Sequence, residues 1–452
     1  MKLCLSVFFS ALIAAILSAE VAASGFALIE QNGSGMGNAY AGSAAIAEDV
    51  SAIFFNPAGM SQLQGKQGVL AAHAIKPSAK FSDNGSVKAD FQPKGGDGGD
   101  AGGLAVLPNA YFVMEINPKI KFGLGVNSPF GLQTEYDPTW IGRFQAVKSK
   151  IQTVNLNPAL SFQINDAVSI GTGLNYQRID GELSSAINYA AIAFAVAGGG
   201  ASGVAAANAA NAAGQGEGLT TFSGDDAAWG YNLGILFKLS EQTRVGLAYR
   251  SAIKYNLSGS VNFSNRPTAA AVGPGIAGYI AANYADGPVS LAIKMPDSFS
   301  ASMLHRIDDK WDIMADASWT HWSVFQQLDV KRANGTTLSS TPENWKNTWR
   351  VAVGANHHYN AQWTSRVGFA YDQSPVSDTY RTARVPDADR TWLALGGQYK
   401  PNSASAVDIG YAHLFVRDAT INQNQSATGA GILTGNYKNS VDILSVQYTQ
   451  SF

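Results

Sequence analysis

Hydrophobic residues recur at every second position in several stretches of the chain. Between residues 229 and 239 one parity carries aromatic and aliphatic side chains, and the other carries mainly small or polar ones. The same alternation recurs over 311–320, 363–372 and 440–452. A two-residue period predicts β-strands with one apolar and one polar face. In the first three stretches aromatic residues stand near the ends of the apolar face, which is typical of membrane-spanning strands.

Short polar breaks separate many of these strands, and a few connections are long. The breaks predicted as periplasmic turns are 165–166, 240–241, 308–310, 360–361 and 402–403. Residues 183–228 and 263–287 are predicted to be extracellular loops. Counting strands from Gly68 onward gives about fourteen, an even number, as a closed bacterial barrel requires.

The composition favours one membrane-embedded unit. Charged residues make up only 14% of the 452 residues and aromatic residues 10%, whereas soluble domains carry about a quarter charged residues. Without spanning helices, only a closed barrel satisfies the backbone in hydrocarbon. We therefore predict an all-β transmembrane fold over 66–452, an antiparallel outer-membrane β-barrel. The alternative is a soluble β-sandwich, whose exposed faces would normally carry more Lys and Glu.

Both ends of the chain fit export to the outer membrane of a Gram-negative bacterium. Residues 1–23 combine Lys2, an apolar stretch and small residues before Ser24, which predicts a cleaved signal peptide. The only cysteine, Cys4, lies in that segment, so the mature chain has no disulfide. At the other end, the last strand closes on Phe452. A terminal aromatic residue resembles the insertion signal of outer-membrane barrels and predicts the barrel-assembly machinery as a partner.

Two loop segments have helical composition. Residues 190–214 are rich in alanine and carry no charge, but glycines 198–200 interrupt them. We predict an amphipathic helix of small residues lying over the barrel mouth. Residues 267–285 are its expected packing partner.

Several other functions find little support in the residues. The net charge of −2 gives a nucleic-acid partner no electrostatic basis. The six histidines show no metal-ligand spacing, and we expect neither a metal nor a cofactor. The chain lacks a Gly-x-Ser-x-Gly elbow. The strongest candidate for a phospholipase pair is His321 with Ser318 or Ser323, and the prediction is that the chain is not an enzyme.

The sequence resembles the long-chain fatty acid transporter family of outer-membrane proteins along the whole mature chain. Each motif occurs in the family's order. The resembling segments are 24–28, 32–42, 56–60 (Asn-Pro-Ala-Gly-Met), 127–131 (Asn-Ser-Pro-Phe-Gly), 140–143, 325–328, 372–376 and 385–390.

This resemblance implies roles for particular residues. Residues 24–65 would form a hatch inside the barrel, with Phe26 contacting ligand. The expected hatch and gating residues are Asn56, Pro57, Ala58 and Asp372. A kinked strand would leave a lateral gap in the wall at Asn127, Pro129, Phe130 and Gly131. Pro129 cannot donate to a strand ladder, which suits such a gap. The protein would be a monomer in outer-membrane lipid.

The chain departs from the family where two basic residues meet the substrate carboxylate. The corresponding spans read Asp-Gly-Glu-Leu at 180–183 and Thr-Pro-Glu-Asn at 341–344, without a cation. Arg178 and Lys346 are the candidate replacements, although Arg178 has outward parity. The expected function is uptake of hydrophobic compounds, most of all long-chain fatty acids. The alternatives are a channel for uncharged hydrocarbons and a general aqueous porin.

Overall fold

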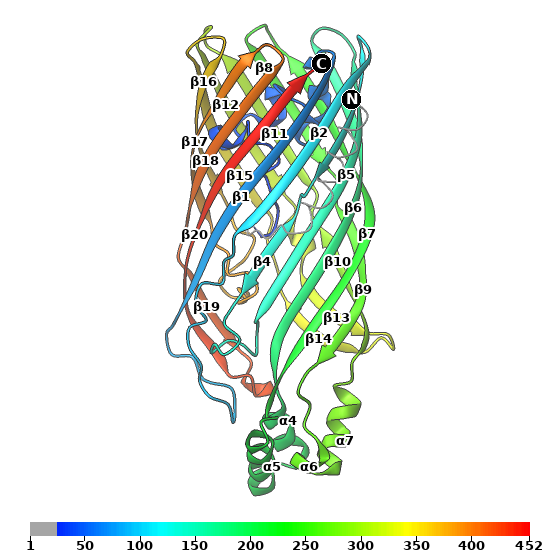
Figure 1. Cartoon of the computed structure of the whole chain (residues 1–452), viewed down its shortest axis with the longest axis vertical. Coiled ribbons are helices and arrows are strands. Elements are labelled where there is room, and N and C mark those ends of the chain that lie inside the picture. Colours follow the sequence, from blue (N-terminus) through cyan, green and yellow to red (C-terminus); the bar gives the residue numbers. More distant parts are fainter. Residues whose placement is uncertain (1–24) are drawn as a thin grey trace.

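The computed structural model describes residues 25–452, so the predicted signal peptide and Ser24 lie outside the described residues. Twenty strands of this part form one antiparallel sheet. The sheet closes on itself because β1 (Lys66–Asp83) pairs with β20 (Ile432–Ser451) along almost their whole lengths. Figure 1 shows the resulting tall barrel. The predicted closed antiparallel barrel is thus confirmed.

The other strands follow one another around the barrel. They are β2 (Ala105–Asn117), β3 (Ile120–Asn127), β4 (Gly131–Glu135), β5 (Lys148–Gln163), β6 (Val168–Asn188), β7 (Glu217–Lys238), β8 (Thr243–Arg250), β9 (Ile253–Phe263), β10 (Gly287–Met295), β11 (Ser298–Arg306), β12 (Trp311–Thr320), β13 (Gln327–Arg332), β14 (Thr337–Pro342), β15 (Thr348–His358), β16 (Trp363–Asp372), β17 (Arg390–Asn402), β18 (Ser405–Val416) and β19 (Ala419–Asn424).

Six staves, meaning segments that run the height of the barrel, are interrupted once, so two successive strands form each of them. These pairs are β3 with β4, β8 with β9, β10 with β11, β12 with β13, β14 with β15, and β18 with β19. Both members of a pair border the same neighbouring stave; β3 and β4, for example, both pair with β5. The described strands therefore make fourteen staves, as predicted.

The two faces of the wall differ as the alternation predicted. On β7 the side chains of Trp229, Tyr231 and Leu233 are exposed on the outside, whereas Asn232 between them is buried. On β20 Leu444 and Val446 likewise face outward. Because lipid surrounds such a barrel, an apolar outer face needs no water.

Short turns gather at one end of the barrel, the turn end, and long loops at the other, the loop end (Figure 1). All five predicted turns join consecutive strands. The long loop expected at 183–228 is shorter than predicted and runs from 189 to 216, because β6 and β7 keep pairing up to Asn188 opposite Glu217. Backbone hydrogen bonds do not depend on the polar side chains that made this stretch resemble a loop.

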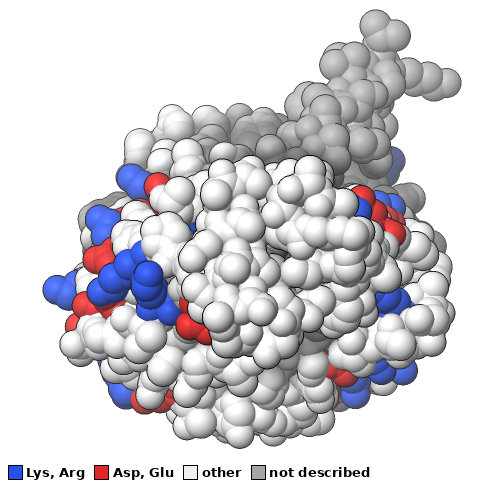
Figure 2. All heavy atoms as spheres, turned by 90° about the horizontal axis from the view of Figure 1, so that it is seen from below, with Lys and Arg blue, Asp and Glu red and all other residues white. Residues whose placement is uncertain are grey.

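Four helices lie at the loop end, at the bottom of Figure 1. They are α4 (Tyr189–Val196), α5 (Gly200–Ala212), α6 (Ala269–Val272) and α7 (Pro274–Asn283). The break between α4 and α5 falls at Gly198 and Gly199, which have positive φ. Ala193, Ala210 and Val272 pack together, so the two predicted segments are indeed partners. None of these helices contains a charged residue, and Figure 2 shows an uncharged central surface with charges towards its margin.

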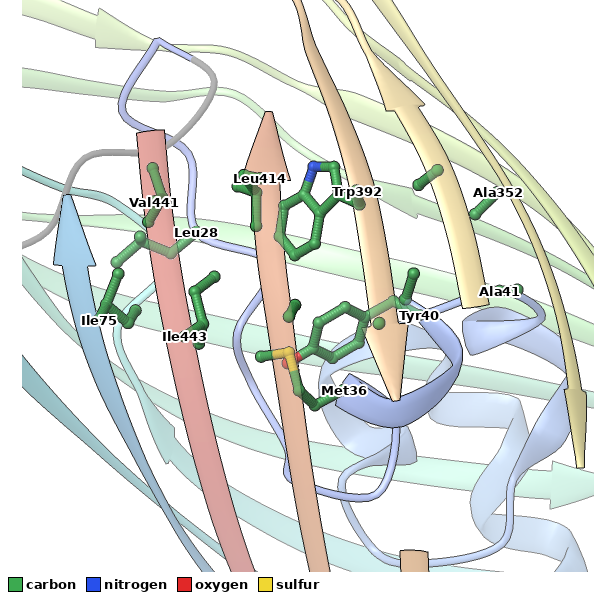
Figure 3. Packing of buried hydrophobic residues seen from close by; sticks show 14 of the residues in the cluster. Leu28, Met36, Tyr40, Ala41, Ile75, Ala352, Trp392, Leu414, Val441 and Ile443 are labelled. Atoms are coloured by element: carbon green, nitrogen blue, oxygen red, sulfur yellow. The ribbon is translucent and has the colours of Figure 1, made fainter. Parts of the chain in front are cut away.

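Residues 25–63 lie inside the barrel rather than in its wall. They contain η2 (Met36–Asn38), α2 (Ser43–Ile46), α3 (Ala52–Phe55) and η3 (Pro57–Gln62). Met36 and Tyr40 pack against Trp392, Leu414 and other inward side chains of the strands, as Figure 3 shows. Among the described residues, no helix is long and apolar enough to cross a membrane. Two further short helices, η4 (Trp322–Val324) and η5 (Ser426–Thr428), interrupt the wall and a loop.

Candidate functional site

An apolar cavity of about 770 Å³ lies in the half of the barrel towards the loop end, and we call it the loop-side cavity. This volume includes space that is open to solvent. The lining is mainly aliphatic and aromatic and comes from several staves. It includes Leu132, Ile151, Ile179, Leu257, Ile293 and Leu328, together with Phe26, Glu343 and Arg384.

A second cavity, the central cavity, is larger and more polar. Its lining brings together Glu30 of the interior segment, Arg250, Arg350 and Asp372. Burial raises the pKa of the Glu30 carboxyl from its ordinary 4.5 to about 7, although Arg390 and Arg350 oppose the shift. Glu30 is only 2% exposed, and its Oε2 has no hydrogen-bond partner among the described residues.

A cluster of five aromatic rings separates the two cavities. Phe26 stands at its centre, with ring centroids 4.7 Å from Trp322, 5.2 Å from Trp345, 5.6 Å from Phe325 and 6.2 Å from Phe130. Only 1% of Phe26 is exposed. The loop-side cavity touches Phe26, whereas the central cavity begins at the next residue, Ala27. Phe26 is therefore the residue of the interior segment that lies between the two spaces.

The predicted weak point of the wall coincides with a break between two strands. β3 ends at Asn127 and β4 begins at Gly131. The interior segment fills the break: Leu28 donates its backbone N–H to the Pro129 carbonyl at 2.8 Å, and Gly131 donates to the Phe26 carbonyl at 2.9 Å. A small pocket adjoins the break and is lined in part by Asn127 and Ser128.

The Asn-Pro-Ala turn is anchored to the wall. Asn56 donates from Nδ2 to the carbonyl oxygens of Ala44, at 2.7 Å, and Ile235, at 3.0 Å. Its Oδ1 accepts from the N–H of Ala58 at 3.1 Å, at the start of η3, where Pro57 takes the first helical position. The wall has room for this turn because residue 234 is a glycine. A Cβ on Gly234 would stand only 1.9 Å from Asn56 Oδ1.

Asp372 lies on the inner face of β16, in a row of charged residues. It is directly opposite Arg350 on one neighbouring strand and Arg390 on the other. Arg350 reaches the interior segment, donating from Nη2 to the Ala39 carbonyl at 2.7 Å. Arg350 and Asp372 are therefore neighbours on the inner face of the wall, and Arg350 connects this row to the interior segment. Arg366 belongs to a different group of charges.

That second charged group holds the interior segment nearer the turn end. Arg366 donates from Nη2 to Glu48 at 2.7 Å and from Nη1 to Asp408 of β18. Burial raises the pKa of the Glu48 carboxyl, and Arg366 opposes that shift. Asp49 accepts from Gln447 of β20 at 2.9 Å. Sequence reasoning did not single out Glu48 or Asp49, although two adjacent acids in a segment otherwise free of charge after Glu30 were a visible signal.

The two cations expected to meet a carboxylate lie outside both cavities. Arg178 is on the outer face of β6, where its side chain is 53% exposed and pairs with Asp180 at 2.9 Å and Asp225 at 3.1 Å. Lys346 is exposed in the turn before β15. Neither lines the loop-side or the central cavity. The cation that does line the loop-side cavity, Arg384, was missed, although it directly precedes the Val-Pro-Asp motif at 385–387.

The residues considered for catalysis and metal binding have other partners. His321 Nδ1 lies 2.9 Å from Asp297 Oδ1, and its ring stacks on Trp319. Ser318 Oγ lies within hydrogen-bond distance of Asp316 Oδ1, at 2.8 Å, and of Ser300 Oγ, at 3.1 Å. Over residues 25–452, no group of three or more His, Cys, Asp or Glu side chains could hold a metal ion.

Comparison with known proteins adds independent information. Residues 14–452 match the family described as outer membrane protein transport protein (OMPP1/FadL/TodX). The long-chain fatty acid transport protein of Escherichia coli K12 is 31% identical over 420 residues, covering 90% of this chain and 92% of that protein.

Solved structures agree with the fold. The crystal structure of a Pseudomonas aeruginosa FadL homologue superposes with a TM-score of 0.84 at 29% identity, covering 94% of this chain and 99% of that one. The Pseudomonas putida toluene transporter TodX gives a TM-score of 0.65 at 17% identity, covering 93% and 98%. At that lower identity the likeness concerns the fold alone.

Proposed function

Because this chain belongs to the family of outer membrane transport proteins described as OMPP1/FadL/TodX, we propose that it takes up hydrophobic compounds through the outer membrane, chiefly long-chain fatty acids. The relative from Escherichia coli K12, which transports long-chain fatty acids by name, supports this substrate class. The observation that carries the proposal is the apolar loop-side cavity, whose inner end is closed by Phe26.

Ligand enters this cavity from the loop end in the proposed mechanism. Each methylene group that moves from water into an apolar cavity contributes about 0.8 kcal/mol to the free energy of binding. A long alkyl chain therefore binds strongly enough to displace side chains that pack against one another. A ligand that reaches the inner end of the loop-side cavity meets the ring of Phe26. Occupation of the cavity would therefore favour displacement of Phe26 from its aromatic neighbours.

Residues 24–65 act in this proposal as a hatch that moves in part. Displacing Phe26 pulls on residues 26–28, whose hydrogen bonds fill the break between β3 and β4. Asn56, Pro57, Ala58 and Asp372 lie in or beside the anchored part of the segment. The start of the hatch can then shift while its remainder stays fixed.

Lateral exit is the final step that we propose. Once residues 26–28 withdraw, Asn127, Pro129, Phe130 and Gly131 border an unfilled break in the wall. A greasy molecule leaves sideways into the outer leaflet, because passage into periplasmic water would return its apolar surface to water. The protein needs no catalytic group for these steps.

Uncharged hydrocarbons are the second candidate substrates, and the aliphatic lining of the loop-side cavity favours them. A general aqueous porin is the third possibility considered. It requires an open lumen, whereas residues 25–63 are packed against strands on several sides of the barrel.

One experiment separates these functions. Proteoliposomes containing the full mature chain are tested for ion conductance and for uptake of labelled oleate, toluene and glucose. We expect oleate uptake with negligible conductance. Uptake of toluene without oleate would support the hydrocarbon channel instead. Strong conductance together with glucose entry would overturn the proposal in favour of a porin.

Assembly and oligomeric state complete the proposal. Phe452 is 79% exposed at the end of the closing strand, where its N–H donates to the Lys66 carbonyl at 2.9 Å. This accessible ring suits recognition by the barrel-assembly machinery. The barrel closes within one chain, so we propose a monomer surrounded by outer-membrane lipid.

A further inference from the structure

Arg384 is a single cation in the lining of an otherwise mostly apolar space. Of the described residues that line the loop-side cavity, only Arg384 is basic and only Glu343 is acidic. The other polar lining residues are Ser149, Ser223 and Ser290. A charged group in such surroundings is costly unless something pairs with it.

The position of Arg384 is fixed by its surroundings. Its Nη1 faces three oxygen acceptors on the wall: Ser149 Oγ at 3.1 Å, the Lys148 carbonyl at 3.2 Å and the Ser184 carbonyl at 3.3 Å. Its own carbonyl accepts from Thr134 Oγ1 at 3.0 Å. The neighbouring Ala383 carbonyl accepts from Tyr136 at 2.7 Å. The guanidinium is thus oriented before any ligand arrives.

One edge of the guanidinium is left unused. Within residues 25–452 neither Nε nor Nη2 of Arg384 donates a hydrogen bond, and Arg384 takes part in no ion pair. Other cations near this end of the barrel are paired: Lys148 with Glu182, and Arg178 with Asp180. Burial lowers the pKa of Arg384 to about 10, so the group remains charged near neutral pH.

Glu343 does not neutralise Arg384 directly. It is 3% exposed and its Oε2 accepts from Trp345 Nε1 at 3.1 Å. Glu343 lies in the turn between β14 and β15. Burial raises the pKa of its carboxyl to about 7. Near neutral pH a sizeable fraction of this carboxyl is therefore protonated, and it offers only a partial countercharge.

We propose that the Nε and Nη2 edge of Arg384 binds the carboxylate of a long-chain fatty acid, whose alkyl chain lies along the apolar lining of the loop-side cavity. The ligand completes the countercharge that Glu343 supplies only in part. A guanidinium edge matches a carboxylate with two parallel hydrogen bonds. The inference rests on the proposed function and deepens it, since it selects fatty acids over uncharged hydrocarbons and assigns the selecting residue.

The test compares oleate with oleyl alcohol, which has the same chain and no charge, on the purified full mature protein in detergent. We expect wild type to bind oleate at least tenfold more tightly. Arg384→Gln should abolish that preference while oleyl alcohol binding changes less than about twofold. Arg178→Gln, which removes a paired cation from the outer wall, is the matched control and should alter neither affinity.

Three results would overturn the assignment: wild type without a preference for oleate, equal losses for both ligands in Arg384→Gln, or an unchanged preference in that variant. Should the glutamine variant fail to fold, Arg384→Lys decides. Lysine can still donate to the wall acceptors but lacks the second edge, so full retention of the preference would refute a role for that edge. If wild type bound neither ligand, the proposed function itself would fail, which is a distinguishable outcome.

Discussion

The N–H of Gly131 donates to the carbonyl of Phe26 at 2.9 Å, so a residue of the barrel wall is hydrogen-bonded to the first part of the interior segment. Leu28 returns a bond to Pro129 at 2.8 Å. These two bonds take the place of strand-to-strand hydrogen bonds at Pro129 and Gly131, in and beside the break between β3 and β4. The start of the interior segment is therefore hydrogen-bonded to the interrupted part of the wall, and a movement of one affects the other.

Phe26→Ala should weaken the separation between the two cavities. The substitution removes a buried ring that contacts four other aromatic side chains, and truncations of this kind cost about 3–5 kcal/mol. We expect weaker oleate binding and a measurable rise in ion conductance in planar bilayers. Phe415→Ala, on the exposed outer face, is the matched control. Unchanged conductance would show that the ring does not close the path.

Filling the wall break should slow transport without preventing folding. The double variant Pro129→Val, Gly131→Val restores a ladder donor and adds side chains where the wall is interrupted. Oleate uptake into proteoliposomes should fall severalfold, while oleate binding in detergent stays close to wild type. A well-folded double variant with normal uptake would argue against lateral exit at residues 127–131.

Gly234→Ala should displace the Asn56 turn. The added Cβ would stand 1.9 Å from Asn56 Oδ1 and 3.0 Å from Pro57 Cδ, closer than any side chain tolerates, so the interior segment must move. We expect the barrel to form and ion conductance to rise. In Gly68→Ala the new Cβ meets nothing nearer than 3.9 Å, and this control should behave as wild type. Equal conductance in both variants would contradict the anchoring role of the turn.

The Glu30 carboxyl should make the packing of the interior segment depend on pH. Burial raises its pKa from 4.5 to about 7 against the opposing effect of Arg390 and Arg350, with Asp372 adding to the rise. The folded state therefore binds more protons than the unfolded state between these values, and Glu30 lowers stability as pH rises through this window. Glu30→Gln should raise the thermal midpoint at pH 8 more than at pH 4. Equal shifts at both values would exclude this ionisation as the cause.

Deleting Phe452 should impair assembly rather than export. The wall is already closed by the pairing of β1 with β20 up to Ser451, so loss of one exposed ring should change the folded barrel little. We expect less protein of heat-modifiable gel mobility in outer membranes and the same amount exported to the periplasm. Tyr448→Ala, on the same outer face, serves as control. Normal assembly of the deletion would remove Phe452 from the insertion signal.

The barrel could be predicted from the sequence because its cause is local. Alternate residues of a strand face the same side of the wall, so the positions of Trp229 and Leu233 along β7 are enough to place them on the lipid side. This alternation is visible in the sequence. Strand ends were less predictable. β6 ends at Asn188 and β7 begins at Glu217. Backbone hydrogen bonds continue to these residues, although apolar and polar side chains no longer alternate there.

The surroundings of charged side chains could not be predicted in the same way. Arg178 was a candidate ligand contact by its position near a family motif, yet its parity pointed outward and the structure agrees with the parity. Arg384 lies in a segment without strand periodicity, so nothing in the sequence indicated which space it faces. Its location depends on contacts with residues 134, 136 and 149, which are far away in the chain.

The aromatic cluster around Phe26 has a consequence for the permeability of the whole cell envelope. If these rings close the path as proposed, a molecule whose apolar surface cannot compensate for separating them would be excluded, whatever its dimensions. Hydrophilic antibiotics small enough for either cavity would thus be turned away, while an alkyl chain of similar bulk passes. Under the proposed function, admission would be decided by the free energy of desolvation and not by a size limit, so a bacterium could carry many copies of this protein without weakening its outer barrier.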